Sequence, residues 1–146
     1  MKPDLFLDAL DDARIVAAIR AAEAVTRAEV RVHVSGEAHA DVEAAAAAAF
    51  DRLGMTATAE RNGVLLFVAP ERQGFAVLGD AGIHARCGEA FWTGVAVAMR
   101  GHFREGRFTD GLVAGIAAVG AELARHYPRR AGDGDRNELP DDVSRD

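Results

Sequence analysis

The sequence predicts an α/β fold, a small mixed β-sheet flanked by helices on both faces, with the element order α-β-α-β-β-α-α. Residues 64–69 (VLLFVA) are an unbroken apolar run, which is typical of a strand that is buried on both faces and central in its sheet. Residues 29–34 alternate between apolar and polar side chains, and four other segments carry apolar residues at helical spacing. Together these segments account for most of the chain.

The first half of the chain supplies a helix, a strand and a second helix. Acidic residues from Asp8 to Asp12 favour a helix start, and this helix is expected to end near Thr26. In residues 29–34 (EVRVHV) the valines share one face, so the other face is predicted to meet solvent or a site. Asp41 is expected to cap a helix that continues through the alanine run to Gly54.

The second half supplies two more strands and two helices. The short turn from Pro70 to Gly74 predicts that a third strand at 75–78 runs antiparallel to the second, whereas the helical crossover makes the first two strands parallel. A single helix is expected from near Ile83 to His102, and Thr109 or Asp110 is expected to cap the last one. Four apolar residues mark the buried side of that last helix: Leu112, Ile116, Val119 and Leu123.

Length and composition indicate one domain over residues 1–128, followed by a mostly disordered acidic tail over 129–146, where apolar content collapses. The net charge of -6 argues against a nucleic-acid partner, which rewards clustered Lys and Arg. No apolar stretch is long enough to insert into a membrane, and the N-terminal segment lacks the apolar run of a signal peptide. These features, with a single cysteine, predict a cytoplasmic protein.

Polar side chains are predicted to meet at one edge of the sheet. If the second strand is central, the start of the first strand (Glu29), the start of the second (Glu60 and Asn62) and the end of the third (Asp80) fall on the same edge. We call these four residues the Asp80 edge. Oxygen ligands of this kind suit a hard cation, Ca²⁺ or Mg²⁺, rather than zinc. The alternative is that Asp80 only caps the following helix and that Glu29 is solvated.

The same residues carry a resemblance to a known family, the TPM domain, over most of residues 12–142. The matching residues are Asn62-Gly63-Val64-Leu65, Gly79-Asp80, Gly82-Ile83-His84, Gly88, Phe91-Trp92, Phe103, Gly106, Phe108, Gly111-Leu112 and Asn137-Glu138-Leu139-Pro140-Asp141. The resemblance implies a small α/β domain, and it supports a divalent cation at the Asp80 edge because some TPM domains bind cations.

Three functions follow as expectations. The first is a binding or regulatory module with a cation site, in stress response or membrane-protein maintenance. The second, implied by activity associated with TPM relatives, is a metal-assisted acid phosphatase that would use free amides at the helix start after Asp80. The third, which the resemblance alone implies, is an assembly partner of a LemA-like membrane protein. No common hydrolase or nucleotide-binding motif is present, so whether the chain is an enzyme stays open, and no catalytic residue is assigned.

Two other groups of residues are weaker candidates. Ligands of α/β folds usually bind beyond the carboxyl ends of parallel strands, which draws attention to residues 35–41, the Ser35 loop, with Glu37, His39 and Asp41. We expect a loop and a helix cap there. His84 and Cys87 stand three residues apart on one helix, but Cys87 falls on the apolar stripe and is expected to be structural.

Overall fold

Within the part of the chain that the structure describes, four strands form one mixed sheet in the order β3-β2-β1-β4. The computed structural model describes residues 10–37, 39–69, 74–129 and 143–145. The strands are β1 (Glu29–Val34), β2 (Gly63–Ala69), β3 (Gly74–Gly79) and β4 (Val143–Arg145). β1 runs parallel to β2 and β4, and β2 runs antiparallel to β3, so the predicted strand directions are confirmed.

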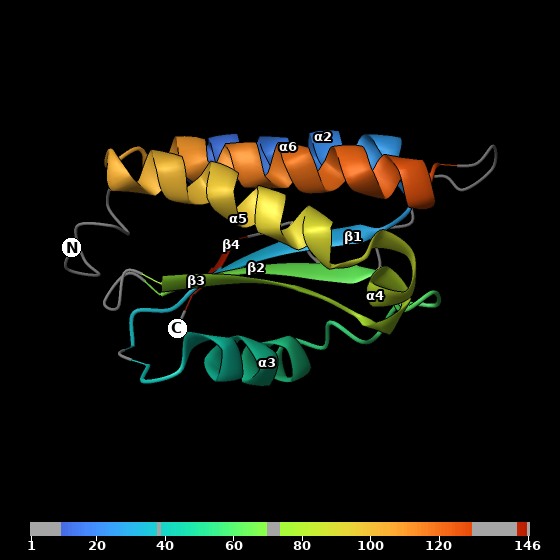
Figure 1. Cartoon of the computed structure of the whole chain (residues 1–146), viewed down its shortest axis with the longest axis horizontal. Helices are drawn as coiled ribbons and strands as arrows, with labels where there is room; N and C mark the ends of the chain where they lie inside the picture. Colours follow the sequence, from blue (N-terminus) through green and yellow to red (C-terminus); the bar gives the residue numbers. More distant parts are fainter. Residues whose placement is uncertain (1–9, 38, 70–73, 130–142, 146) are drawn as a thin grey trace.

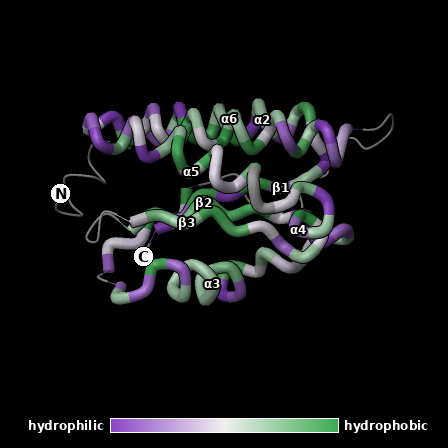
Figure 2. Tube along the Cα trace, viewed as in Figure 1, coloured by the Kyte–Doolittle hydropathy of each residue, from purple (hydrophilic) through white to green (hydrophobic). Residues whose placement is uncertain are grey.

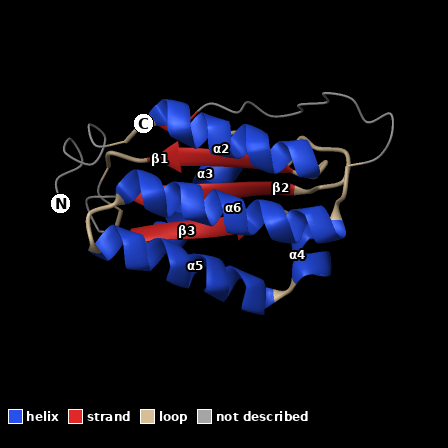
Figure 3. Ribbon diagram, turned by 90° about the horizontal axis from the view of Figure 1, so that it is seen from above, coloured by secondary structure: helices blue, strands red, loops and turns tan. Residues whose placement is uncertain are grey.

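Helices cover both faces of this sheet, as predicted (Figures 1 and 3). On one face lie α2 (Asp12–Val25), α5 (Glu89–Arg104) and α6 (Phe108–His126), and α3 (Val42–Arg52) lies on the other. The short α4 (Ala81–Cys87) follows β3 at the end of the sheet. No helix in these described residues combines the length and apolar character that crossing a bilayer requires.

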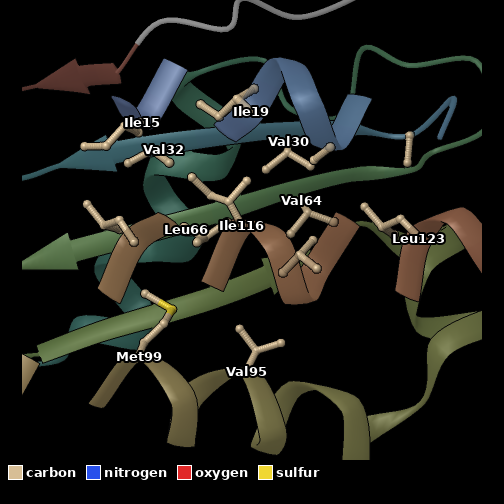
Figure 4. Close-up of a cluster of buried hydrophobic side chains, with 14 of the residues drawn as sticks. Ile15, Ile19, Val30, Val32, Val64, Leu66, Val95, Met99, Ile116 and Leu123 are labelled. Carbon is tan, nitrogen blue, oxygen red and sulfur yellow. The ribbon is translucent and has the colours of Figure 1, made fainter. Parts of the chain in front are cut away.

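The main core lies between the sheet and the three-helix face. All seven residues of β2 are buried, and the strand is a hydrophobic stretch in the middle of the molecule (Figure 2). The valines of β1 meet Ile15 and Ile19 of α2, and Ile116 of α6 lies over the adjoining strand (Figure 4). A smaller cluster beneath α3 includes Leu65 and Phe67. The other face of β1 is also closed, since Glu29 and His33 are buried, whereas the sequence predicted a face toward solvent or a site.

Helix starts agree with the sequence at two places and differ at two. Asp11 caps α2 and Asp41 caps α3 through their side chains. The helix expected from Ile83 to His102 is broken by Gly88, whose φ of +75° is left-handed and suits glycine. The expected cap of α6 is wrong, because that helix starts at Phe108 and has no side-chain cap.

Thr109 and Asp110 instead tie α6 to the start of α2. The amide of Asp11 donates to Thr109 Oγ1 at 3.0 Å, and Arg14 donates to Asp110 at 2.9 Å. Close approach between the two helices depends on small residues, because a Cβ at Gly120 would lie 2.7 Å from Ala22 Cβ.

The tail departs from the expectation in its last residues. Val143–Arg145 form β4 and pair with Val32–Val34 of β1, so this part of the predicted disordered tail is ordered. Residues 130–142, which include the family-matching residues Asn137 to Asp141, and residue 146 lie outside the described residues. Periodicity could not reveal β4 because three residues are too few to show an alternating pattern.

Candidate functional site

The backbone places the residues of the Asp80 edge side by side. The amide of Glu29 donates to the carbonyl of Asn62 at 3.3 Å, and the amide of Asp80 donates to the carbonyl of Gly63 at 2.9 Å. Glu29, Asn62 and Asp80 are 2%, 1% and 5% exposed, whereas Glu60 is exposed. The predicted topology therefore does bring three buried oxygen-bearing side chains to adjacent positions on neighbouring strand ends.

Asp80 is already neutralised by an arginine. Arg61 donates from Nε and from a terminal nitrogen to the two carboxylate oxygens, at 2.6 and 2.8 Å, and the amide of Ala81 donates to one of them at 2.7 Å. Burial by itself would raise the pKa of Asp80, but these donors outweigh it and the pKa is lowered. The charged carboxylate thus stabilises the fold at pH above about 4, and this contribution is lost as the pH falls through the lowered pKa.

Arg61 holds an unusual backbone conformation for this interaction. Its φ of +52° lies in the left-handed region, which is uncommon for residues other than glycine and asparagine. Its side chain is 51% exposed, so one end of this ion pair borders solvent. In the sequence, Arg61 next to Asn62-Gly63 indicates a turn, but nothing in the sequence points to its partner Asp80, 19 residues away.

Glu60 is paired with a second arginine. Arg27 donates to both of its carboxylate oxygens, at 2.7 and 3.1 Å, and also to the carbonyl of Pro128. The guanidinium of Arg27 lies 5.3 Å from the ring centre of Tyr127, and that of Arg86 lies 4.6 Å from it. Arg27 therefore connects this edge of the sheet to the end of α6, where the buried Tyr127 caps the core.

Asn62 carries a buried polar atom that lacks a partner. Its amide donates to Thr58 Oγ1 at 3.1 Å, and its side-chain nitrogen makes a long contact of 3.5 Å with the carbonyl of Arg27. The side-chain oxygen Oδ1 is buried and, among the described residues, has no hydrogen-bond donor. A buried carbonyl oxygen in this state has lost its water without replacing it, which favours a cation or an ordered water beside it.

The carboxylates alone do not make a metal site. In the parts of the chain that the structure describes, no three His, Cys, Asp or Glu side chains converge closely enough to hold an ion. The candidate ligands at the Asp80 edge are instead mixed, because Asn62 offers an amide oxygen where Glu29 and Asp80 offer carboxylates, and Arg61 holds both oxygens of Asp80. Metal binding by Glu29, Glu60, Asn62 and Asp80 stays a prediction.

The first four amides of α4 are all used within the protein. The amide of Ala81 donates to the Asp80 side chain, that of Gly82 to the carbonyl of Arg61 at 3.0 Å, and those of Ile83 and His84 to the carbonyl of Asp80 at 3.0 and 3.2 Å. The expectation that amides after Asp80 would attract an anion is therefore wrong, because the turn that delivers the chain into α4 already satisfies them.

The Ser35 loop is held by side-chain contacts around Phe67. His39 Nε2 and Ser35 Oγ share a hydrogen bond of 2.7 Å, and the His39 ring meets the edge of Phe67. His33 stacks on Phe67 with ring centres 5.6 Å apart. Ser35 is fully buried, so its hydroxyl does not meet solvent as a nucleophile would. Asp41 caps α3, as expected.

Cys87 and His84 do not form a site together. His84 is exposed and its ring lies near Trp92, while Cys87 is partly buried against the main core. Burial and the nearby charge of Glu122 raise the pKa of the Cys87 thiol. A thiol with a raised pKa is a weak nucleophile near neutral pH, which agrees with a structural role.

Replacing Cys87 with valine is expected to change the free energy of unfolding by less than about 1 kcal/mol, since it exchanges one small apolar side chain for another at the margin of the core. Chemical denaturation of both proteins measures this. Rapid modification of the native thiol by a thiol reagent, or a loss of several kcal/mol in the variant, would contradict the structural role.

Comparison with known proteins agrees with this architecture. The family model of the TPM domain matches residues 2–122. The NMR structure of the BA42 protein from the psychrophilic bacterium Bizionia argentinensis is 37% identical in sequence, with a TM-score of 0.85, and covers 94% of this chain and 95% of its own. The N-terminal domain of a protein from P. gingivalis shares the fold, with a TM-score of 0.66 at 20% identity over 83% of this chain and 82% of its own. Comparison with curated proteins gives no match. The match over most of the chain shows that this protein belongs to the TPM domain family.

Proposed function

We propose that the protein is a binding module whose ligand is a divalent cation, Ca²⁺ or Mg²⁺, held at the Asp80 edge. The observation that carries the proposal is the buried Oδ1 of Asn62, which has no donor among the described residues and lies next to the strand ends that carry Glu29 and Asp80. An amide oxygen and carboxylates at adjacent strand ends are the ligands that hard cations prefer. The side chains of Glu29, Asn62 and Asp80 would hold the ion, with Glu60 at its outer side.

Binding requires that the cation take Asp80 from Arg61. The guanidinium and the ion are alternative positive partners of one carboxylate, so the measured affinity is the cation's own interaction reduced by the loss of the Arg61 hydrogen bonds. Arg61 is suited to leave because half of its side chain is already in solvent. Its left-handed backbone also costs energy that the ion pair helps to offset.

The wider role is proposed on the family's properties alone. These support a part in stress response or membrane-protein maintenance, with a LemA-like membrane protein as a partner, and the cytoplasmic location stays a prediction. The alternative activity, a metal-assisted acid phosphatase, has less support than cation binding, because the amides that would have bound the phosphate group are used within the protein.

Calcium is expected to raise the melting temperature of the protein relative to EDTA. At one hundred times its Kd, a ligand that binds only the folded state adds about 2.7 kcal/mol, which corresponds to about 5–10 °C for a chain of this size. Asp80→Asn should remove most of this rise. It should also lower the melting temperature without calcium, because Arg61 loses its charged partner. Repulsion among the carboxylates is not the larger effect here, since Arg61 already compensates the charge of Asp80 in the wild type.

The matched control is Asp110→Asn, which removes another arginine-paired aspartate, the partner of Arg14 where α2 meets α6. This variant should keep the full response to calcium. Superimposable melting curves of the wild type in EDTA and in excess calcium would show that the Asp80 edge binds no such ion. An equal response of Asp80→Asn and the wild type would place the ion elsewhere, with the Ser35 loop as the next candidate.

A further inference from the structure

The side of β1 that faces away from β2 is covered in two different ways along its length. The amides of Glu29 and Ser35 donate toward β2, so the intervening even-numbered residues direct their backbone groups to the opposite side. There, the amide of Val30 donates to the carboxylate of Glu23 at 2.9 Å. Val32 and Val34 instead face β4. Glu23 of α2 therefore covers one half of this edge, and the three residues of β4 cover the other half.

β4 is attached through specific polar contacts at its second and third residues. Ser144 Oγ donates to the carbonyl of Val32 at 3.3 Å and shares a hydrogen bond of 2.7 Å with Nδ1 of the buried His33. Because the hydroxyl proton goes to Val32, this arrangement favours the ring tautomer in which Nδ1 donates. Arg145 forms a fork with Asp12 of α2, at 2.6 and 2.8 Å. These contacts make the pairing of β4 depend on a hydroxyl group at residue 144 and on a positive charge at residue 145, and not only on apolar packing.

The same strand is weakly held for an element of the sheet. It has three residues, and Val143 is the residue that packs against the main core. The Arg145–Asp12 pair is partly exposed, and such pairs contribute little to stability. An element with so few buried contacts opens locally without unfolding of the domain. Without β4, the edge from Val32 to Val34 would be unpaired.

We propose that the edge of β1 from Val32 to Val34 is a docking site for an extended peptide segment of a partner protein, and that β4 occupies it as an intramolecular substitute. The partner segment would add to the sheet parallel to β1. The contacts of β4 define its chemistry: a β-branched apolar residue in place of Val143, a hydroxyl residue that meets His33, and an arginine that pairs with Asp12. Glu23 limits the length of the added strand because it already holds the amide of Val30.

The competition between β4 and a partner sets the conditions for binding. A segment tethered to the domain acts at an effective concentration of about a millimolar, so a separate peptide of equal intrinsic affinity would be largely excluded from the wild type. A variant with a weakened β4 should expose the edge. The full-length double variant Ser144→Ala, Arg145→Glu removes the contact with His33 and sets the introduced carboxylate against that of Asp12, so that two negative charges repel each other.

The test uses fluorescence anisotropy with a labelled peptide of residues 141–146, DDVSRD. The peptide should bind the double variant at least tenfold more tightly than the wild type. A peptide with alanine in place of Ser144 should bind more weakly. A peptide with glutamate in place of Arg145 should bind the double variant more weakly than DDVSRD does, because its carboxylate would face that of Asp12. Hydrogen exchange should show Val34 exposed in the double variant and protected again by the peptide, with Val30 protected throughout.

Several results would overturn the proposal. If a scrambled peptide binds the double variant as well as DDVSRD does, the edge does not recognise the sequence of the peptide. If DDVSRD binds the wild type and the double variant equally, β4 does not compete with the peptide for the edge. If the double variant is unfolded by circular dichroism, β4 is part of the folding unit and not a detachable strand. If the double variant elutes as a dimer, the edge pairs with a second copy of the chain rather than with a partner peptide.

Discussion

Alanine in place of Gly82 is expected to destabilise the protein by about 3 kcal/mol or more, a loss of about 6–12 °C in melting temperature. A Cβ at this position would lie 2.8 Å from the carbonyl oxygen of Arg61 and closer still to that of Glu60, with the Tyr127 hydroxyl 3.0 Å away. Two of these neighbours are backbone atoms, so the loop that carries Asn62 would have to move. The loop is part of the Asp80 edge, and the variant should also lose its response to calcium.

The matched control for Gly82→Ala is Gly94→Ala in α5. Among the described residues, no atom outside the surrounding turns of its own helix lies within 4 Å of a Cβ built at Gly94, and the residue is in the interior of that helix. Alanine should therefore stabilise the protein by about 0.4–1 kcal/mol through helix propensity and a more restricted unfolded chain. Thermal unfolding of the two variants should give shifts of opposite sign. A Gly82→Ala protein as stable as the wild type would show that the loop does not pack on α4 as described.

Ile116→Ala is expected to cost about 2–5 kcal/mol. Ile116 is fully buried in α6 and lies over the central strands, between the side chains of α2 and those of α5 (Figure 4). Shortening it leaves a cavity in the layer that joins the three helices to the sheet, and the surrounding residues can close the cavity only in part. Denaturant titration of the variant measures the loss as a lower midpoint with an unchanged slope.

Val97→Ala supplies the comparison on an exposed helix surface. Val97 of α5 is 60% exposed, so its replacement removes almost no buried area, and alanine is the better helix former. The variant should be as stable as the wild type to within about 0.5 kcal/mol. A cost for Ile116→Ala no larger than that for Val97→Ala would mean that α6 is not packed on the sheet.

The elements of the fold could be predicted because their signals are local. The apolar run of β2 and the alternation in β1 each appear within seven residues, and the connection lengths then fix the strand directions. Gly88 was missed as a break because the residues after it continue the helical spacing of apolar side chains. The start of α6 was placed late because Thr109 and Asp110 look like caps in sequence, whereas they bind α2 across 98 and 96 positions.

The arrangement at the Asp80 edge could be predicted only in part. Topology places Glu29, Asn62 and Asp80 on neighbouring strand ends, and the structure agrees. The partners of the acids could not be read from the sequence, because Arg27 and Glu60 are 33 residues apart and their pairing depends on how the turn before β2 is packed. The orphaned oxygen of Asn62 is likewise a property of packing rather than of residue type.

The proposed cation site depends on one exchange, in which a divalent cation takes the carboxylate of Asp80 from Arg61. Heteronuclear NMR of the ¹⁵N-labelled protein follows it directly through the Nε–H signal of Arg61 and the side-chain amide of Asn62 during a calcium titration. We expect both signals to move together and to saturate with one affinity, and the Arg61 proton to lose its protection from exchange with water. An Arg61 signal that stays unchanged at saturating calcium, or shifts that gather in the Ser35 loop instead, would contradict the exchange.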